Sequence, residues 1–117
     1  MELIEAVKKK NYNKLVNLIE SKANINIQNK NGNTALMFSV SDNNDKFVEK
    51  LLESKACIDI QNAIGDTAMD YAYSNKIIEL IKYHKRRKIV DQMTQIFPFP
   101  VVGGHIVLYE WIAEYVM

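Results

Sequence analysis

The residues with the most reactive side chains are one cysteine, Cys57, and two histidines, His84 and His105. Nucleophilic catalysis needs a nucleophile, a base and a group that orients the base, and these three residues have no partners at a patterned spacing. They also lack the spacing that is typical of zinc ligands. We therefore interpret Cys57 as a small, partly buried residue and the histidines as helix-end and loop residues. This pattern predicts no enzyme, no bound metal and no cofactor.

Two further segments resemble binding motifs in composition. VVGG at residues 101–104 is too short for a phosphate loop and lacks the Lys and Ser or Thr that follow one, which favours a bend before a last helix. KYHKRRK at residues 82–88 is a dense basic run, which we interpret as the C-terminal turn of a helix plus a solvated face. A nuclear localisation signal and a phosphate-contacting patch stay open as alternatives. The run has one aromatic residue, Tyr83, and lacks the repeated aromatic interleaving of segments that bind single strands, which argues against nucleic acid.

Length and charge restrict the remaining classes of protein. The chain has 117 residues, enough for one small domain, and a formal net charge of +1, which gives no global attraction to nucleic acid or to a membrane surface. No apolar run reaches the roughly 20 residues that a membrane-spanning helix needs. Cys57 is the single cysteine, so an internal disulfide is excluded. We expect a cytoplasmic protein, in the host cytoplasm or nucleus if the source is a virus or an intracellular bacterium.

An internal repeat with a period of about 33 residues supplies the elements that must position any functional residue. NKNGNTALMFSV at residues 29–40 recurs as NAIGDTAMDYAY at residues 62–73. IESKANINIQN at residues 19–29 recurs as LESKACIDIQN at residues 52–62. A fixed period of this length predicts stacked supersecondary units.

Each unit has a local pattern of its own. Leu36, Met37 and Val40 form one apolar stripe on a short helix, and Thr34 stands where an N-cap belongs. A second helical pattern follows, and CIDIQ at residues 57–61 then alternates as an extended chain does. Asn31-Gly32 reverses the chain, because glycine tolerates a positive φ. The second helix is expected to bury Phe47, Val48, Leu51 and Leu52.

These motifs make the sequence similar to the ankyrin repeat family, whose unit of about 33 residues carries Gly-x-Thr-Pro-Leu-His. Residues 32–37 read GNTALM here, and residues 65–70 read GDTAMD. Two lysines, Lys22 and Lys55, stand where the family has a glycine. If they adopt the left-handed conformation that glycine supplies, each costs about 1 kcal/mol.

The resemblance implies an all-α solenoid of stacked helix-turn-helix units with β-turn fingers over residues 1–84. Residues 1–28 form a partial repeat and residues 29–61 a full one, and residues 62–84 form a repeat with about three residues fewer between its helices. We expect residues 85–117 to add a C-terminal helical cap, because their apolar side chains need cover.

The resemblance also implies a non-catalytic module that binds a partner protein on a concave surface, as a monomer and without a small-molecule substrate. The residues expected to face the partner lie on the finger tips and at the ends of the first helices of the units. Ile64 is the aliphatic residue at a tip and is the candidate for a hydrophobic anchor. The tip residues are Lys30, Asn31, Asn33, Ala63, Ile64 and Asp66, and the helix-end residues are Lys8, Lys9, Ser41, Asp42, Ser74 and Asn75.

Two other functions stay open at this stage. FPFPVVGGHIVLYEWI at residues 97–112 resembles the F-box-like segment with which some ankyrin proteins recruit a ubiquitin ligase. The residues that carry this resemblance are Phe99, Pro100, Val107, Leu108 and Trp111. The chain could also be a fragment or an end cap of a longer repeat array, because its first unit starts in the middle of the repeat.

Overall fold

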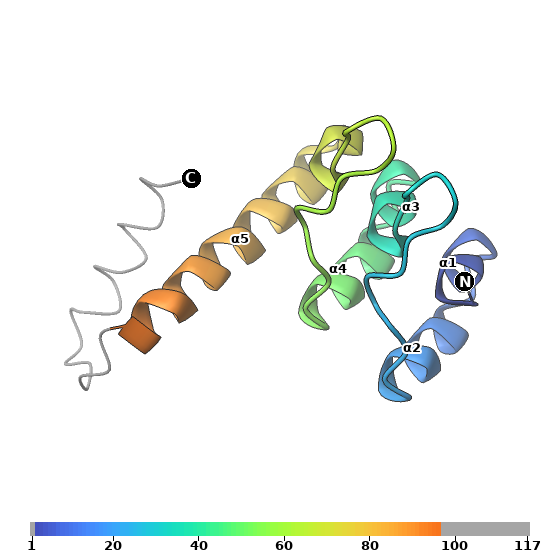
Figure 1. Cartoon of the computed structure of the whole chain (residues 1–117), viewed down its shortest axis with the longest axis horizontal. Coiled ribbons are helices and arrows are strands. Elements are labelled where there is room, and N and C mark those ends of the chain that lie inside the picture. Colours follow the sequence, from blue (N-terminus) through green and yellow to red (C-terminus); the bar gives the residue numbers. More distant parts are fainter. Residues whose placement is uncertain (1, 97–117) are drawn as a thin grey trace. The chain divides into compact units, whose positions relative to one another are not determined.

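The structure, a computed structural model, describes residues 2–96. The chain divides into two compact units, residues 1–81 and residues 82–117. No strand occurs among the described residues, and the all-α class predicted from the sequence is confirmed. The elements in chain order are α1 (Glu2–Lys8), α2 (Tyr12–Glu20), α3 (Ala35–Ser41), α4 (Asp45–Glu53), the 3₁₀ turn η1 (Ala68–Tyr71) and α5 (Asn75–Ile96) (Figure 1).

The helices begin at capping residues that recur with the repeat. Asn11 accepts a hydrogen bond from the Lys14 N–H at the start of α2, and Asn44, at the equivalent position of the next unit, caps α4 in the same way. Thr34 accepts from the Met37 N–H at 3.3 Å, so the predicted cap of α3 is confirmed. These side chains satisfy backbone donors that the first turn of a helix leaves unpaired.

The first four helices end in the same left-handed turn. Lys22 has φ 64°, its N–H donates to the Ile19 carbonyl, and the Ala23 N–H donates to the Leu18 carbonyl. This pair of bonds is the Schellman motif, in which the left-handed residue closes the last turn. The conformation considered for Lys22 and Lys55 is therefore the one that they adopt, with Lys55 at φ 68°. Lys10 and Asn43, at φ 57° and 55°, add two such ends that the sequence pattern did not reveal.

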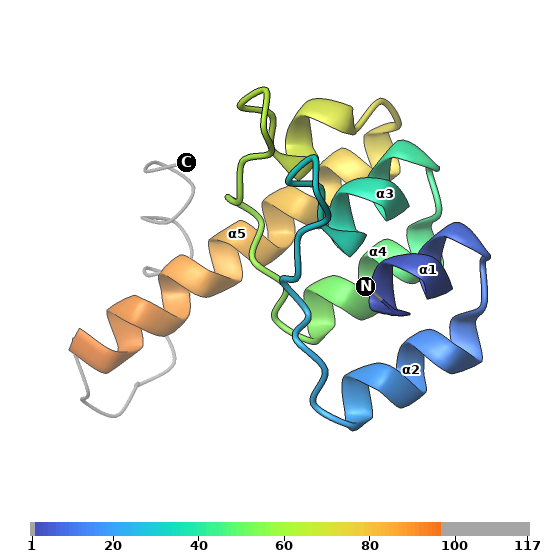
Figure 2. The same ribbon diagram turned by 45° about the vertical axis from the view of Figure 1, so that its right-hand side comes forward.

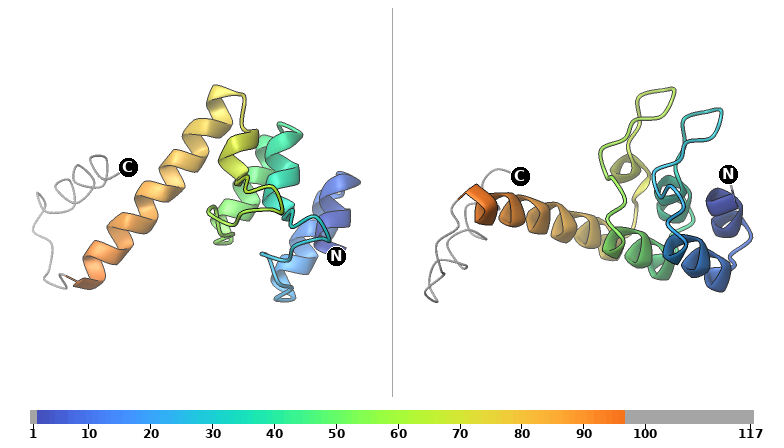
Figure 3. Two further views of the ribbon diagram at one scale, coloured as in Figure 1. Left: turned by 45° about the horizontal axis from the view of Figure 1, so that its top comes forward. Right: turned by 60° about the horizontal axis from the view of Figure 1, so that its bottom comes forward.

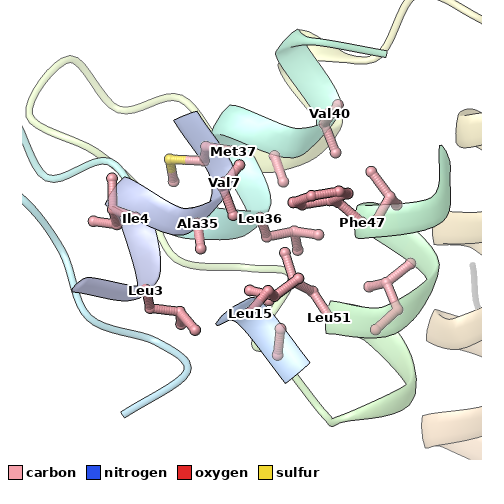
Figure 4. Close-up of a cluster of buried hydrophobic side chains, with 14 of the residues drawn as sticks. Leu3, Ile4, Val7, Leu15, Ala35, Leu36, Met37, Val40, Phe47 and Leu51 are labelled. Carbon is pink, nitrogen blue, oxygen red and sulfur yellow. The ribbon is translucent and has the colours of Figure 1, made fainter. Parts of the chain in front are cut away.

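The core lies between neighbouring helix pairs. α1 contacts α2 and α3, and α3 contacts α4 and η1 (Figure 2). Leu36 and Leu51 are buried as predicted, and Leu3, Ile4 and Val7 of α1 lie against the same cluster (Figure 4). Each helix pair thus buries its apolar side against the next pair, which is how a repeat protein gains stability.

The two fingers, residues 29–33 and 62–66, lie side by side in the right panel of Figure 3. Each is closed by an asparagine: the Asn29 side chain accepts from the N–H groups of Asn31 and Asn33, and Asn62 repeats this with Ile64 and Asp66. The Ala63 N–H donates to the Asn31 carbonyl at 3.0 Å and joins one finger to the other.

Gly32 and Gly65 occupy equivalent finger positions but have different surroundings. Both have positive φ, 80° and 86°. A Cβ on Gly32 would lie 2.9 Å from the Ala63 nitrogen and from the Asn62 Cα, whereas a Cβ on Gly65 would meet nothing within 4 Å. Gly32 is therefore needed both for its conformation and for the close approach of the second finger.

The third unit departs from the repeat. Ser74 accepts from the Ile77 N–H and caps α5, as Asn44 caps α4, but it stands earlier in the chain than an unbroken period would place it. The missing residues fall on the first helix, which shrinks to the turn η1 followed by extended Ala72. An extended residue advances about 3.3 Å along the chain and a helical residue about 1.5 Å. The shorter segment can therefore still span the distance from the second finger to α5, because part of its helix is unwound.

The interpretation of the basic run as a helix end is wrong. Residues 82–88 lie inside α5, which continues to Ile96, so their charges do not stand at its C-terminal turn. α5 also continues past residue 84, where we expected the third repeat to end.

The Gly32 contact leads to a first prediction, with Gly65 as its matched control. Gly65→Ala should lower the free energy of unfolding by about 1–2 kcal/mol, because alanine resists a positive φ. Gly32→Ala should cost about 1–3 kcal/mol more, because its methyl group overlaps the second finger. Urea titrations of both variants measure the difference, and equal losses would contradict the close approach.

The left-handed lysines give a second prediction. Lys22→Gly and Lys55→Gly should each raise the free energy of unfolding by about 0.5–1 kcal/mol, because glycine adopts this conformation without strain. The control, Lys14→Gly inside α2, should instead lower it by about 1 kcal/mol. Urea titration distinguishes the two signs, and destabilisation at Lys22 and Lys55 would disprove the strain.

Candidate functional site

The predicted finger-tip residues project from the fold beside the exposed sides of α1, α3 and η1. We use the name finger–helix surface for the finger tips, at residues 30–33 and 63–66, together with the exposed sides of α1, α3 and η1. Lys30, Asn31, Ala63 and Ile64 are exposed, and Ile64 is the most exposed large hydrophobic residue described, at 78%. Hydrogen bonds within and between the fingers fix the backbone beneath these side chains.

Asn33 and Asp66 are half-buried and have partners within the fold. The Asn62 side-chain nitrogen donates to the Asn33 side-chain oxygen and to the Tyr71 hydroxyl, both at 2.8 Å. The Tyr71 hydroxyl in turn donates to Asp66 at 3.1 Å. Asn33 therefore joins the first finger to the second, Asp66 holds the second finger against η1, and both expose only part of their side chains.

The residues predicted at the helix ends are found in two different settings. Lys8 and Ser41 are the last residues of α1 and α3, and Lys9 and Asp42 follow them, all four exposed. Ser74 and Asn75 do not lie at the end of a first helix, because the unit is shortened there. Ser74 caps α5 and Asn75 is its first residue, so these two placements were wrong.

A small open cavity lies between α3 and η1. Its volume is about 110 Å³, and its walls come from α3, from Tyr71 of η1 and from Asn33 of the first finger. The Lys8 ammonium lies 4.9 Å from the centre of the Phe38 ring, which forms one wall. The residues that line the cavity are Asn33, Met37, Phe38, Ser41 and Tyr71.

The sequence pattern assigned Asn33 and Ser41 to the site, but Met37, Phe38 and Tyr71 were not predicted as site residues. A signal for two of them was present, since Phe38 and Tyr71 occupy equivalent positions of successive units. Both are half-buried and pack against the core, but the repeat does not require an apolar residue there, because the equivalent residue of the first unit is the exposed Glu5. Aromatic residues at a repeat position that need not be apolar indicate a contact surface.

The described residues do not form a metal site or a membrane span. They contain no group of three His, Cys, Asp or Glu side chains that could hold a metal ion. None of the described helices combines the length and the apolar character that crossing a bilayer requires. Cys57 is partly exposed, as predicted, and its N–H donates to the Asn26 side chain.

The resolved pKa shifts lie at the starts of second helices. The ion pair between Asp45 of α4 and Lys76 of α5 lowers the pKa of Asp45 and raises the pKa of Lys76. The hydrogen bond between the two side chains is the larger cause of both shifts, and the attraction of their charges is the next. Both side chains are largely exposed, so the pair contributes little to stability. Nearby, Lys46 lies over the Tyr12 ring and Tyr12 packs edge-on against Phe47.

Several predictions from the sequence concern residues outside the described range. The helical cap, the bend at 101–104, His105 and the F-box-like segment at residues 97–112 all involve residues beyond 96. The cap and the ubiquitin-ligase function therefore stay predictions.

Comparison with known proteins agrees with the repeat. A family model described as ankyrin repeats, three copies, matches residues 3–89. The solved ankyrin repeat domain of Bcl-3, described as a unique member of the IkappaB protein family, is 28% identical and superposes with a TM-score of 0.67. The match covers 68% of this chain and 35% of the Bcl-3 chain, so this chain spans about a third of that length. No curated protein matches this sequence.

The bridging hydroxyl of Tyr71 gives a third prediction. Tyr71→Phe should lower the free energy of unfolding by about 1–2 kcal/mol, because the partly buried Asp66 carboxylate loses a donor. Amide exchange at Ala63 should also quicken as the second finger loosens. Tyr73→Phe is the control and should change neither quantity, since Tyr73 is 69% exposed. Equal behaviour of the two variants would show that the bridge does not hold the finger.

Proposed function

Because the chain belongs to the ankyrin repeat family, whose repeats are protein–protein interaction modules, we propose that it binds a partner protein on the finger–helix surface. The observation that supports this proposal best is Ile64, an aliphatic side chain that is 78% exposed at a finger tip. An exposed apolar side chain gains free energy when a partner removes it from water.

The backbone under Ile64 favours this role. The Ile64 N–H donates to the Asn62 side chain, and the neighbouring Ala63 N–H donates to the first finger. The tip therefore loses little conformational entropy when a partner binds, which raises affinity without any further contact. Lys30 and Asn31 on the first tip are exposed and lie beside it.

The proposal assigns partner contact to the exposed residues of the predicted set and a supporting role to two others. Asn33 and Asp66 hold the fingers through Asn62 and Tyr71. Ser74 and Asn75 leave the proposed site, because they start α5. The proposed contact residues are Lys8, Lys9, Lys30, Asn31, Ser41, Asp42, Ala63 and Ile64.

The proposal is for a non-catalytic cytoplasmic monomer without a cofactor. Ankyrin repeat domains are typically non-catalytic, and function on such a fold depends on its surface residues. The single cysteine, Cys57, is a free thiol, which suits a reducing compartment. The similarity to the Bcl-3 domain supports the fold of the repeats.

Affinity enrichment with paired baits tests the proposal. One bait carries Lys30→Glu and Ile64→Glu on the finger tips, and the control bait carries Asn13→Glu and Asn17→Glu on the exposed side of α2. Proteins recovered from the source cell by the unmodified chain should fall by about ten-fold with the finger bait, as expected when an interface centre is disrupted. They should persist with the α2 bait. Partners whose recovery falls only with the α2 bait would show that binding takes place on the other side of the fold.

A further inference from the structure

We infer that the partner is bound through an extended acidic peptide segment, one apolar side chain of which enters the cavity between α3 and η1. This inference rests on the proposed function and names the chemistry of the partner. Three observations carry it: the size of the cavity, the polar groups at its rim, and the lysines beside it.

The size of the cavity fits a single side chain. Pockets for drug-sized ligands measure about 300–1,000 Å³, and this one measures about 110 Å³. Its apolar walls are the Phe38 and Tyr71 rings and the buried Met37. Tyr71 is fixed by its two hydroxyl hydrogen bonds, so the cavity does not have to be built when the partner arrives. An aliphatic or aromatic peptide side chain is the occupant of matching size and polarity.

The rim offers hydrogen bonds of the kind that an extended peptide needs. Ser41 and Asn33 line the cavity beside the rings. Within the described part of the chain, the Ser41 hydroxyl and the Asn33 side-chain nitrogen make no hydrogen bond, while the Asn33 side-chain oxygen accepts from Asn62. An extended chain leaves its backbone N–H and C=O groups unpaired, so these two side chains can satisfy them.

The charge beside the cavity favours an acidic segment. Four exposed lysines lie on the elements beside the cavity: Lys8, Lys9 and Lys10 at and after the end of α1, which contacts α3, and Lys30 on the finger whose Asn33 lines the cavity. Among the described residues none of the four has an ion pair, although Lys8 contacts the Phe38 ring. Glu5 and Asp42 are the exposed carboxylates closest in sequence to these helix ends, so the positive charge is in excess.

This excess is local to the end of α1 and the first finger. The whole chain has a net charge of only +1. The carboxylates of the third unit lie on the η1 side, where Asp66 accepts from the Tyr71 hydroxyl and Asp70 from the Thr67 N–H and hydroxyl, and these neutral donors leave their negative charge in place. A peptide with carboxylates next to its apolar anchor meets unpaired cations on the α1 side, whereas a basic peptide meets repulsion there.

Selection from a phage-displayed library of random peptides tests the inference, with the full chain as bait. The peptides recovered should be rich in Asp and Glu around one apolar residue. Synthetic copies labelled with fluorescein then report the Kd by fluorescence anisotropy against the variants below. Added salt should weaken binding, because exposed charges are screened.

Two pairs of variants locate the bound peptide. Ser41→Phe fills the cavity from its rim, and Asn17→Phe adds the same ring to the exposed side of α2 as a control. Lys8→Gln with Lys9→Gln removes two charges beside the cavity, and Lys14→Gln with Lys50→Gln removes two charges elsewhere. The first member of each pair should raise Kd by about ten-fold and the second should leave it unchanged. Circular dichroism verifies that each variant folds.

The outcomes separate this inference from the proposed function. Acidic peptides that respond to Ser41→Phe and to the Lys8 and Lys9 pair support it. Peptides that respond to Lys30→Glu with Ile64→Glu but not to Ser41→Phe overturn it and leave the proposed function intact. Basic or neutral peptides overturn the acidic partner, and so does a library that yields no binder. Peptides insensitive to every variant of the finger–helix surface overturn the proposed function as well.

Discussion

No helix pair among residues 2–81 can bury its apolar side chains alone, and the rest of the structure depends on this constraint. Leu36 of α3 and Leu51 of α4 are buried because α1 and η1 flank their unit. Stacking is therefore obligatory, and it assigns each helix a side that holds the stack and a side that faces away from it. Residues on the second side are free to take up a function, since the core does not need them.

The spacing of the stack is set by backbone contacts between the fingers. The Ala63 N–H reaches the Asn31 carbonyl only because Gly32 has no side chain at the point of contact. The same approach brings Asn62 within reach of Asn33 and places Tyr71 opposite α3. One missing methyl group thus connects the packing of the fold to the shape of the candidate site.

The fold could be predicted from the sequence further than the site could. The signals that predicted the fold are local: the matches at the repeat period, the cap Thr34 and the left-handed Lys22 and Lys55. Each depends on residues close together in the chain, so the sequence alone was enough to predict it. Ser74 and Asn75 were misplaced because their assignment assumed an unbroken period across a deletion. The cavity was missed because it depends on Tyr71 lying across from Phe38, which only the packing of η1 against α3 determines.

The same register explains why a stack of nearly identical units can bind at one place. The position occupied by Phe38 in the second unit is Glu5 in the first and Tyr71 in the third. Within the described units, this repeat position therefore carries an aromatic residue in two successive units only where α3 faces η1, and unpaired lysines lie on the Glu5 side. A ligand that slid by one unit would exchange ring contacts for a carboxylate. In the binding mode that we infer, variation at a single repeat position thus fixes both where the segment lies on the surface and which end of it is acidic.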